Sequence, residues 1–227
     1  QGPWHYDPEV AMYFEVQSPG ACHVYTVEQA PSNPEVVYCG TATAGMYRSE
    51  NKGLNWDLIS GDLPVTGVYS IAISPSDADV VFLGSSNGDL YKSYNGGMTW
   101  DVCGNNAYQS SSRWYRTIMF CENGILAATN DGLWFSEDLG DSMQLIQAGE
   151  FMELEQHPTD PSVLYTVKLQ GSETIFMKSV DGGLSFSNSG VGSGWPTIDS
   201  GSEQKRTEIS VSLAEPDAVY ALAAGST

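Results

Sequence analysis

The sequence lacks the features that mark membrane proteins and nucleic-acid-binding proteins. It has no run of 18 apolar residues, so no segment has the composition of a membrane-spanning helix. Basic residues are scarce, with 9 Lys and Arg against 28 Asp and Glu and a net charge of -19. A surface this acidic repels phosphate backbones and anionic headgroups. We therefore expect neither nucleic-acid binding nor membrane insertion.

Motifs of metal binding and nucleophilic catalysis are also missing. The four cysteines form no C-x-x-C pair and no Cys/His cluster at zinc spacing. Several disulfide pairings of Cys22, Cys39, Cys103 and Cys121 are open, Cys103 with Cys121 among them, and buried free thiols are the alternative. No G-x-S-x-G elbow, phosphate-binding loop or D-x-D-x-D-G calcium loop is present, although surface carboxylates leave calcium open. We expect no cofactor and no specified metal site.

What the sequence does contain is one turn motif that recurs at a fixed interval. Its four copies are "SENKGLNW" from Ser49, "SYNGGMTW" from Ser93, "SEDLGDSM" from Ser136 and "SVDGGLSF" from Ser179. The copies start 44, 43 and 43 residues apart. Such a period marks a repeat architecture, in which each repeat is one supersecondary unit.

Each repeat also carries four short stretches with the character of strands. In the second copy these are "VYSIAIS", "VVFLG", "LYKS" before the turn and "TWDVC" after it. Period-two alternation, β-branched and aromatic residues, and Pro, Asp and Gly between the stretches indicate antiparallel strands, here called A to D. Four-stranded sheets at this period indicate an all-β fold, a β-propeller, whereas a β-sandwich would not repeat one turn at a fixed interval. We expect residues 1–227 to form one partial propeller with units at about 22–60, 66–104, 115–147, 150–188 and, incomplete, 207–227.

The repeated turn resembles the Asp box, or BNR repeat, whose pattern is S-x-D/N-x-G-x-x-W/F. Proteins of that class place the box between strands C and D, so the resemblance is a signal of fold. We expect the Asn or Asp to accept hydrogen bonds from backbone N–H groups two or three residues on, the Gly to adopt a positive φ, and the last aromatic to anchor the core between sheets. The matching residues are Ser49, Asn51, Gly53 and Trp56; Ser93, Asn95, Gly97 and Trp100; Ser136, Asp138 and Gly140, with Met143 in place of the aromatic; and Ser179, Asp181, Gly183 and Phe186.

Two enzyme families with this motif make demands that the sequence does not meet. Sialidases hold a substrate carboxylate with three arginines. Arg48 lies beside the first turn, which does not suit it to be one of them, and the early Arg-Ile-Pro signature is missing. Xyloglucanase-type hydrolases resemble this chain at "YCGTATAGMYR", residues 38–48, yet Ala42 stands where that family has a catalytic Asp. Asp131, in "TNDGLWF", lies in the equivalent loop of the third unit. Glycoside hydrolysis needs two placed carboxyl groups, so we do not expect catalytic residues.

The loops between strands D and A offer a candidate binding surface. The segment "NNAYQSSSRWYR", residues 105–116, brings together Arg113, Trp114, Tyr115 and Arg116, and a Gly/Ser-rich insertion at 187–206 holds Trp195. Exposed aromatics beside Arg are typical of interface hot spots and sugar platforms. The alternative is that Trp114 and Tyr115 fill a junction between sheets. Together with Asp131, these residues form the candidate binding set.

The segment "PSNPEVVYCGTATAGMYRSENKGLNW" is similar in sequence to the amino-terminal repeats of large secreted bacterial surface proteins with sortilin-like domains. This resemblance implies a non-catalytic, secreted or cell-surface propeller that binds a protein segment or a polysaccharide. An open propeller leaves unpaired strand edges, so we expect the rest of a longer chain or a partner to complete it. The alternatives are a glycoside hydrolase of the xyloglucanase type and a structural spacer within a large adhesin.

Overall fold

The structure is a computed structural model that describes residues 23–65, 67–104, 108, 110–171, 173–190, 195 and 206–224. The chain divides into two compact units, an N-terminal unit of Gln1–Val102 and a C-terminal unit of Cys103–Thr227. Within the described ranges every regular element is a β-strand. The two units are considered separately below.

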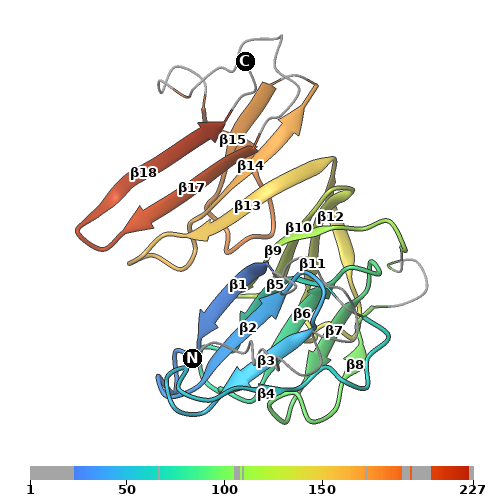
Figure 1. The fold of residues 1–227 in the computed structure, drawn as a ribbon. Coiled ribbons are helices and arrows are strands. Elements are labelled where there is room, and N and C mark those ends of the chain that lie inside the picture. The colour runs from blue at the N-terminus through green and yellow to red at the C-terminus, as the bar shows by residue number, and fades with distance from the viewer. Residues whose placement is uncertain are drawn as a thin grey trace. The chain divides into compact units, whose positions relative to one another are not determined.

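The N-terminal unit holds two four-stranded antiparallel sheets, each with its strands in chain order (Figure 1). The first sheet consists of β1 (Val24–Gln29), β2 (Val37–Thr41), β3 (Met46–Ser49) and β4 (Asp57–Leu58). The second consists of β5 (Val68–Ile73), β6 (Val81–Ser85), β7 (Leu90–Ser93) and β8 (Asp101–Val102).

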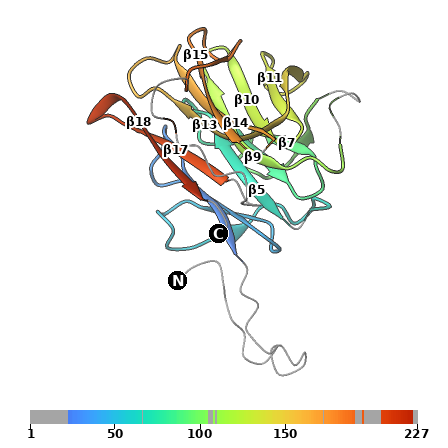
Figure 2. The same ribbon diagram turned by 90° about the horizontal axis from the view of Figure 1, so that it is seen from above.

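The C-terminal unit continues the same pattern with two four-stranded sheets and one two-stranded sheet (Figure 2). The third sheet consists of β9 (Tyr115–Cys121), β10 (Gly124–Thr129), β11 (Gly132–Ser136) and β12 (Gln144–Ala148). The fourth consists of β13 (Glu150–Gln156), β14 (Leu164–Gln170), β15 (Glu173–Ser179) and β16 (Ser187–Asn188). The fifth consists of β17 (Arg206–Ser212) and β18 (Glu215–Ala224).

The expected fold class, four antiparallel strands per repeat with the repeated turn between strands C and D, is confirmed by these sheets. The assignment of residues 1–227 to a single propeller stays a prediction. Residues 1–22, with Cys22 among them, and most of the 187–206 insertion lie outside the described residues.

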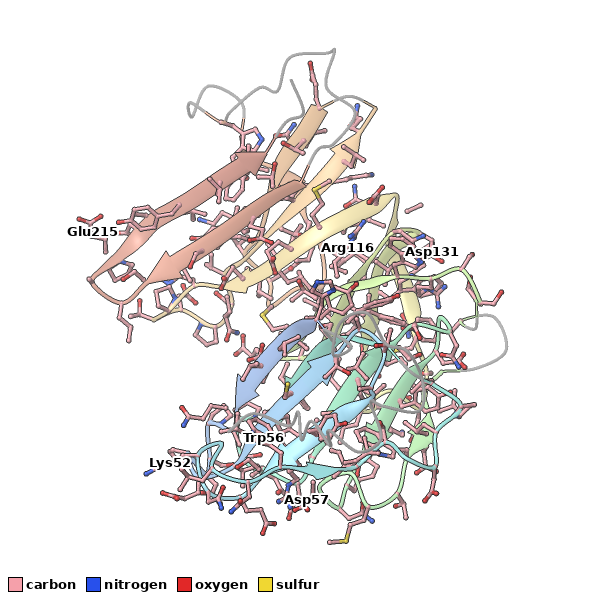
Figure 3. All side chains as sticks on the ribbon, in the orientation of Figure 1. Lys52, Trp56, Asp57, Arg116, Asp131 and Glu215 are labelled. Atoms are coloured by element: carbon pink, nitrogen blue, oxygen red, sulfur yellow. The ribbon has the colours of Figure 1, made fainter. Side chains whose placement is uncertain are left out.

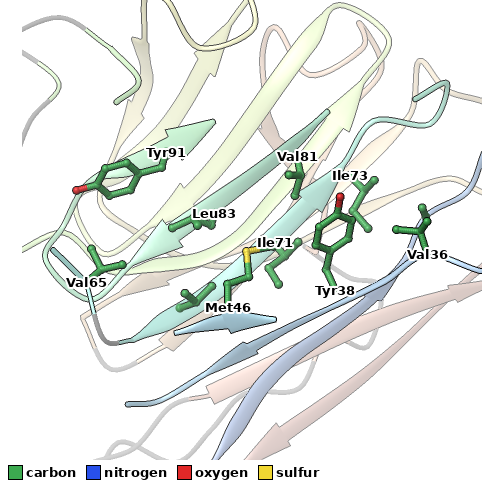
Figure 4. Packing of buried hydrophobic residues seen from close by; sticks show 11 residues of the cluster. Val36, Tyr38, Met46, Val65, Ile71, Ile73, Val81, Leu83 and Tyr91 are labelled. Carbon is green, nitrogen blue, oxygen red and sulfur yellow. The ribbon is translucent and has the colours of Figure 1, made fainter. Parts of the chain in front are cut away.

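The core of each unit lies between consecutive sheets. In the N-terminal unit Met46 of the first sheet packs with Ile71 and Leu83 of the second, and Figure 4 shows these side chains converging. In the C-terminal unit Leu126 of the third sheet packs with Phe151 of the fourth. Because side chains alternate along a strand, the first and second sheets, and likewise the third and fourth, pack through the apolar residues of one face of each sheet.

Each C–D turn is closed by the hydroxyl of its first residue. Ser93 Oγ accepts hydrogen bonds from the backbone N–H groups of Asn95, at 3.2 Å, and Gly97, at 2.9 Å, and donates to Asn95 Oδ1 at 2.9 Å. Asn95 Oδ1 in turn accepts from the N–H of Thr99 at 2.9 Å. This donor is four residues on, whereas a donor two or three residues on was expected. The same bonds recur in the turns that begin at Ser49, Ser136 and Ser179.

The C–D turn also packs on the preceding sheet. Gly97 has a φ of 91°, and a Cβ atom there would lie 2.5 Å from Cδ1 of Ile59, which follows the last strand of the first sheet. Trp100 reaches the same residue, because its Nε1–H donates to Ile59 O at 2.9 Å. Phe186 packs against the cluster between the third and fourth sheets. Trp56 instead donates to Gly53 O of its own turn at 3.0 Å and is half-buried.

Replacing Trp100 by Phe keeps an aromatic ring in the core and removes one hydrogen bond. We expect the free energy of unfolding of the N-terminal unit to fall by about 1 kcal/mol, since Ile59 O loses its donor. Phe186 fills the matching place in the fourth sheet, so a phenyl ring is compatible with the turn. Urea unfolding of the two proteins measures the difference, and an unchanged midpoint would mean that the Trp100 N–H contributes nothing.

Two of the four turns carry a titratable carboxylate at the third position. Hydrogen bonds from the hydroxyl and backbone N–H of Ser142 lower the pKa of Asp138 to about 2, from an ordinary value of 3.8. Burial raises the pKa of Asp181, but hydrogen bonds from Ser185 and Ser179 outweigh that effect and lower it. Each carboxylate therefore stabilises the fold in its charged form.

Because both pKa values lie lower in the folded chain, each carboxylate contributes stability above pH 3.8 that is lost as the pH falls through its folded pKa, which is about 2 for Asp138. Asn51 and Asn95 make the same bonds in the other two turns without titrating. We therefore expect an Asp138→Asn, Asp181→Asn double variant to lose less stability than the wild type between pH 4 and about 2. Urea unfolding across that range tests this, and equal slopes for the two proteins would contradict it.

No disulfide is formed by the cysteines of the described residues. Cys39 and Cys103 are buried and Cys121 is half-buried, and burial raises the pKa of the Cys121 thiol. The Cys103–Cys121 bridge that the sequence leaves open is not formed.

Candidate binding surface

The candidate residues of the third sheet gather where its D–A loop meets its B–C loop. Trp114 N–H donates to Asn130 Oδ1 at 2.7 Å, and Asn130 N–H donates to Trp114 O at 3.2 Å. Gly149 N–H, just before β13, donates to Asp131 O at 3.4 Å. We call this part of the C-terminal unit, with Trp114, Arg116, Asn130 and Asp131, the loop end, and Figure 3 labels Arg116 and Asp131 in it.

Arg113 lies beneath the loop end and fixes it. Its side chain is 3% exposed, and its Nε and Nη2 atoms donate to Asp131 at 2.9 and 2.8 Å. Its Nη1 donates to Tyr108 O. The guanidinium carbon lies 4.3 Å from the Tyr108 ring centre and 4.5 Å from that of Trp134, within cation–π range. The charge is thus satisfied by a forked ion pair and two rings.

Asp131 is held as an ionised group. Besides Arg113, it accepts hydrogen bonds from Thr129 Oγ1 at 2.6 Å and from Trp134 Nε1 at 3.2 Å. Burial raises the pKa of Asp131, but the bonds from Arg113, Thr129 and Trp134 outweigh burial and lower it. A general acid needs the opposite shift, so this carboxylate is poorly suited to donate a proton near neutral pH.

Two residues of the candidate binding set are core residues. Arg113 and Tyr115 are buried, so neither side chain can contact a partner at the surface, and this corrects the surface role that the sequence suggested for them. Burial raises the pKa of Tyr115 and, beside it, of Tyr108. Their part is to support the loop end from below.

The exposed members of the set are Trp114 and Arg116. The Trp114 side chain is 53% exposed, and the Arg116 guanidinium carbon lies 5.6 Å from its ring centre. Arg116 Nη2 also pairs with Glu150 Oε1 at 3.0 Å. Lys168 is a second cation nearby. It lies beside Gly149, the residue before Glu150, where a Cβ atom would be 3.2 Å from its Nζ. An exposed indole face is thus flanked by charges of both signs.

Trp195 lies on the fourth sheet. Its ring stacks on Phe176 with centres 5.1 Å apart, and its Nε1–H donates to Thr174 O at 2.9 Å. The side chain is half-buried and packs with the cluster between the fourth and fifth sheets. Trp195 thus has an anchored position, and the rest of its insertion lies outside the described residues except 187–190 and Arg206.

Three residues of the site were missed from the sequence: Trp134, Glu150 and Lys168. Trp134 follows Asp131 by three residues, a spacing that brings its indole N–H to the carboxylate across the start of β11. Glu150 and Lys168 are neighbours only through the pairing of β13 with β14. No local motif marks such a pairing in advance.

Among the described residues, no group of three or more His, Cys, Asp or Glu side chains could hold a metal ion. Nor does that part of the chain contain a helix long and apolar enough to cross a membrane.

No family model and no curated protein matches this sequence. Solved structures do. The GH74 xyloglucanase from Xanthomonas campestris matches with a TM-score of 0.64 and 18% identity, over 84% of this chain and 32% of that one. YCF48 from Cyanidioschyzon merolae matches with a TM-score of 0.57 and 9% identity, over 91% and 73% of the two chains.

A structure of YCF48 bound to D1 peptide matches with a TM-score of 0.53 and 18% identity, over 79% of this chain and 57% of that one. The chain thus spans about a third of the length of the xyloglucanase, for which the covered share is 32%. At these sequence identities the matches show a shared fold and do not indicate a shared activity. With the sheets described above, they establish that this chain has the fold of a partial β-propeller.

Proposed function

We propose that this chain belongs to a non-catalytic binding propeller, secreted or on a cell surface, that recognises a protein segment or a polysaccharide at the loop end. The observation that carries the proposal is the 53% exposure of Trp114 on a loop fixed by the ion pair between the buried Arg113 and Asp131. A rigid aromatic that is already exposed loses little conformational entropy on binding. The Arg113–Asp131 ion pair thus holds the loop in place, and Trp114 is the residue that contacts the ligand.

The chemistry around Trp114 suits two kinds of ligand. An indole face packs on the apolar face of a sugar ring or on a peptide side chain. Arg116 and Lys168 can donate hydrogen bonds to hydroxyl, carbonyl or carboxylate oxygens. Arg116 pairs with Glu150, and Lys168 lies beside the neighbouring Gly149, so two of the 9 basic residues of the chain lie around this turn.

Among the described residues, the positions to which the resemblance to xyloglucanases points do not supply two placed carboxyl groups, and this supports binding over hydrolysis. Asp131 is paired with Arg113 and has a lowered pKa, and Ala42 offers no carboxyl group where the resemblance to xyloglucanases calls for one. A propeller of similar fold, YCF48, has been solved bound to a peptide. That structure is a precedent for a binding role and names no ligand for this chain.

A second candidate function is glycoside hydrolysis. It is favoured by the likeness to a GH74 xyloglucanase, with a TM-score of 0.64. In this reading Asp131 would be one of the two catalytic carboxylates.

One experiment separates the two functions. The full chain is titrated by calorimetry with xyloglucan and, separately, with a synthetic D1 peptide, and the xyloglucan samples are assayed for new reducing ends. We expect saturable binding of one probe, weakened at least tenfold by Trp114→Ala, or about 1.4 kcal/mol. Tyr94→Ala is the matched control, since Tyr94 is an exposed aromatic of the N-terminal unit.

New reducing ends that vanish in a folded Asp131→Asn variant would replace the binding proposal by the hydrolase. Equal binding by the wild type and Trp114→Ala would remove the loop end from the account. No binding of either probe would favour the structural spacer.

A further inference from the structure

The fifth sheet ends in an open strand edge. In the four complete sheets the second strand, β2, β6, β10 or β14, lies between strand A and strand C. Among the described residues β18, the second strand of the fifth sheet, pairs only with β17. Figures 1 and 2 both show β18 at the outer edge of the C-terminal unit. An edge of this kind presents unpaired backbone groups to an incoming strand.

The side chains of β18 have the same arrangement as those of the paired second strands. In the first, second and fourth sheets an aromatic residue of the second strand lies directly opposite a basic residue of strand C. These pairs are Tyr38 with Arg48, Phe82 with Lys92, and Tyr165 with Lys178. Tyr220 occupies the matching place in β18, because it follows Val219 as Phe82 follows Val81 and pairs with the corresponding position of strand A.

The face of β18 that carries Tyr220 is uncovered among the described residues. Tyr38, Phe82 and Tyr165 are buried, whereas Tyr220 is 53% exposed and Leu222, on the same face of β18, is 74% exposed. In the first and fourth sheets the basic residue lies over the aromatic ring, at 5.8 Å for Arg48 and 5.7 Å for Lys178. A strand that brings a cation opposite Tyr220 would restore this contact.

The fourth sheet also has an apolar residue that is only half-buried. Phe176 stands three residues before Ser179, and the matching residues before Ser49 and Ser136 are Met46 and Leu133. Met46 and Leu133 are fully buried, and Phe176 is half-buried. Val219 of β18 already packs in the cluster that contains Phe176, so a strand added beyond β18 extends the fifth sheet over the rest of this apolar face.

Charge also favours a basic occupant. Glu215 and Asp217 lie at the start of β18, and the Tyr220 hydroxyl donates to Glu215 Oε2 at 2.7 Å. We propose that the open edge of β18 accepts an antiparallel strand of the C type, in which a basic residue lies opposite Tyr220 and the following Ser lies opposite Val219. The occupant is a C–D hairpin with the pattern apolar–aromatic–basic–Ser, continued by the Ser-to-aromatic turn.

The probe for this test is a synthetic peptide of residues 88–102, which contains such a hairpin with Lys92 as its basic residue. Hydrogen–deuterium exchange of β18 in the full chain is measured with and without the peptide. At saturating peptide we expect the β18 amides that point away from β17 to exchange about tenfold more slowly. A peptide with Lys92→Glu should bind more weakly, because it loses the cation and faces Glu215 and Asp217.

Variants of the chain separate edge pairing from non-specific contact. Leu222→Lys places a charge on the exposed face of the edge and should abolish the protection. Leu213→Lys is the matched control, since Leu213 is 73% exposed in the turn between β17 and β18 and lies off the edge. It should leave the protection unchanged.

Unchanged β18 exchange at saturating peptide would overturn the proposal. Equal protection by the peptide and its Lys92→Glu form would overturn the assigned register. Self-association of the chain that Leu222→Lys abolishes, with no response to the peptide, would assign the edge to a second copy instead.

Discussion

Replacing Arg113 by Met is expected to lower the free energy of unfolding of the C-terminal unit by about 2–4 kcal/mol. The substitution leaves Tyr108 O without its donor and removes the contacts with the Tyr108 and Trp134 rings. It also strips Asp131 of its partner, although that carboxylate is 38% exposed and can be partly hydrated, which limits the loss. Urea unfolding followed by Trp fluorescence, with hydrogen exchange in β9 and β10, measures the effect.

Arg116→Met is the matched control for this prediction. The side chain has the same chemistry three residues along the chain, but its pair with Glu150 is at the surface, so we expect a loss within about 1 kcal/mol. Arg113→Lys should not restore stability, because an ammonium cannot form the forked pair with Asp131. If Arg113→Met and Arg116→Met cost the same, Arg113 is not the support of the loop end.

Gly97→Ala is expected to destabilise the N-terminal unit by about 2–4 kcal/mol. The substituted residue would have to keep a φ of 91°, which side chains disfavour, and its Cβ would lie 2.5 Å from Ile59 Cδ1 and 3.0 Å from Ile59 Cβ. The first of these atoms ends a flexible side chain, but the second does not move without the backbone. Urea unfolding with hydrogen exchange in β5 to β7 measures the loss.

Gly171→Ala separates the two causes. Gly171 also has a positive φ, of 61°, but a Cβ atom there would meet nothing within 4 Å. We expect it to cost about 1 kcal/mol in the C-terminal unit, from backbone strain alone. Equal losses for the two glycines would mean that the turn does not press on the preceding sheet.

The sheets could be predicted from the sequence because the same pattern of strands and turns occurs in each repeat. Four turns that begin at a Ser, three of which end in an aromatic residue, recur at nearly equal spacing and fix where strands C and D meet, and period-two alternation marks the strands between them. The turn that ends in Met143 has the same hydrogen bonds as the others despite its missing aromatic. Ser and Asp or Asn therefore define the turn, and its hydrogen bonds do not require an aromatic residue at the last position.

The candidate site was predicted in part. Tyr115 and Arg116 are adjacent in a strand, so one had to point inward, but strict alternation from the buried Ile118 would have assigned Arg116 to the buried face. The β-bulge at this point of the β9–β10 pairing reverses that assignment, and no sequence signal marks it. Arg113 could not be placed this way, because it precedes β9 and its partner Asp131 is 18 residues away across a loop. The pairing depends on which loops meet, and spacing along the chain does not encode that.

The central claim, that the C–D turn of the second sheet is packed on the first sheet, is tested most directly by a double-mutant cycle of Gly97 and Ile59. Shortening Ile59 to Ala makes room for the methyl group of Gly97→Ala, so the double variant should be more stable than the sum of the single losses by about 1–2 kcal/mol. Losses that add to within about 0.5 kcal/mol would place the two residues out of contact and contradict the claim.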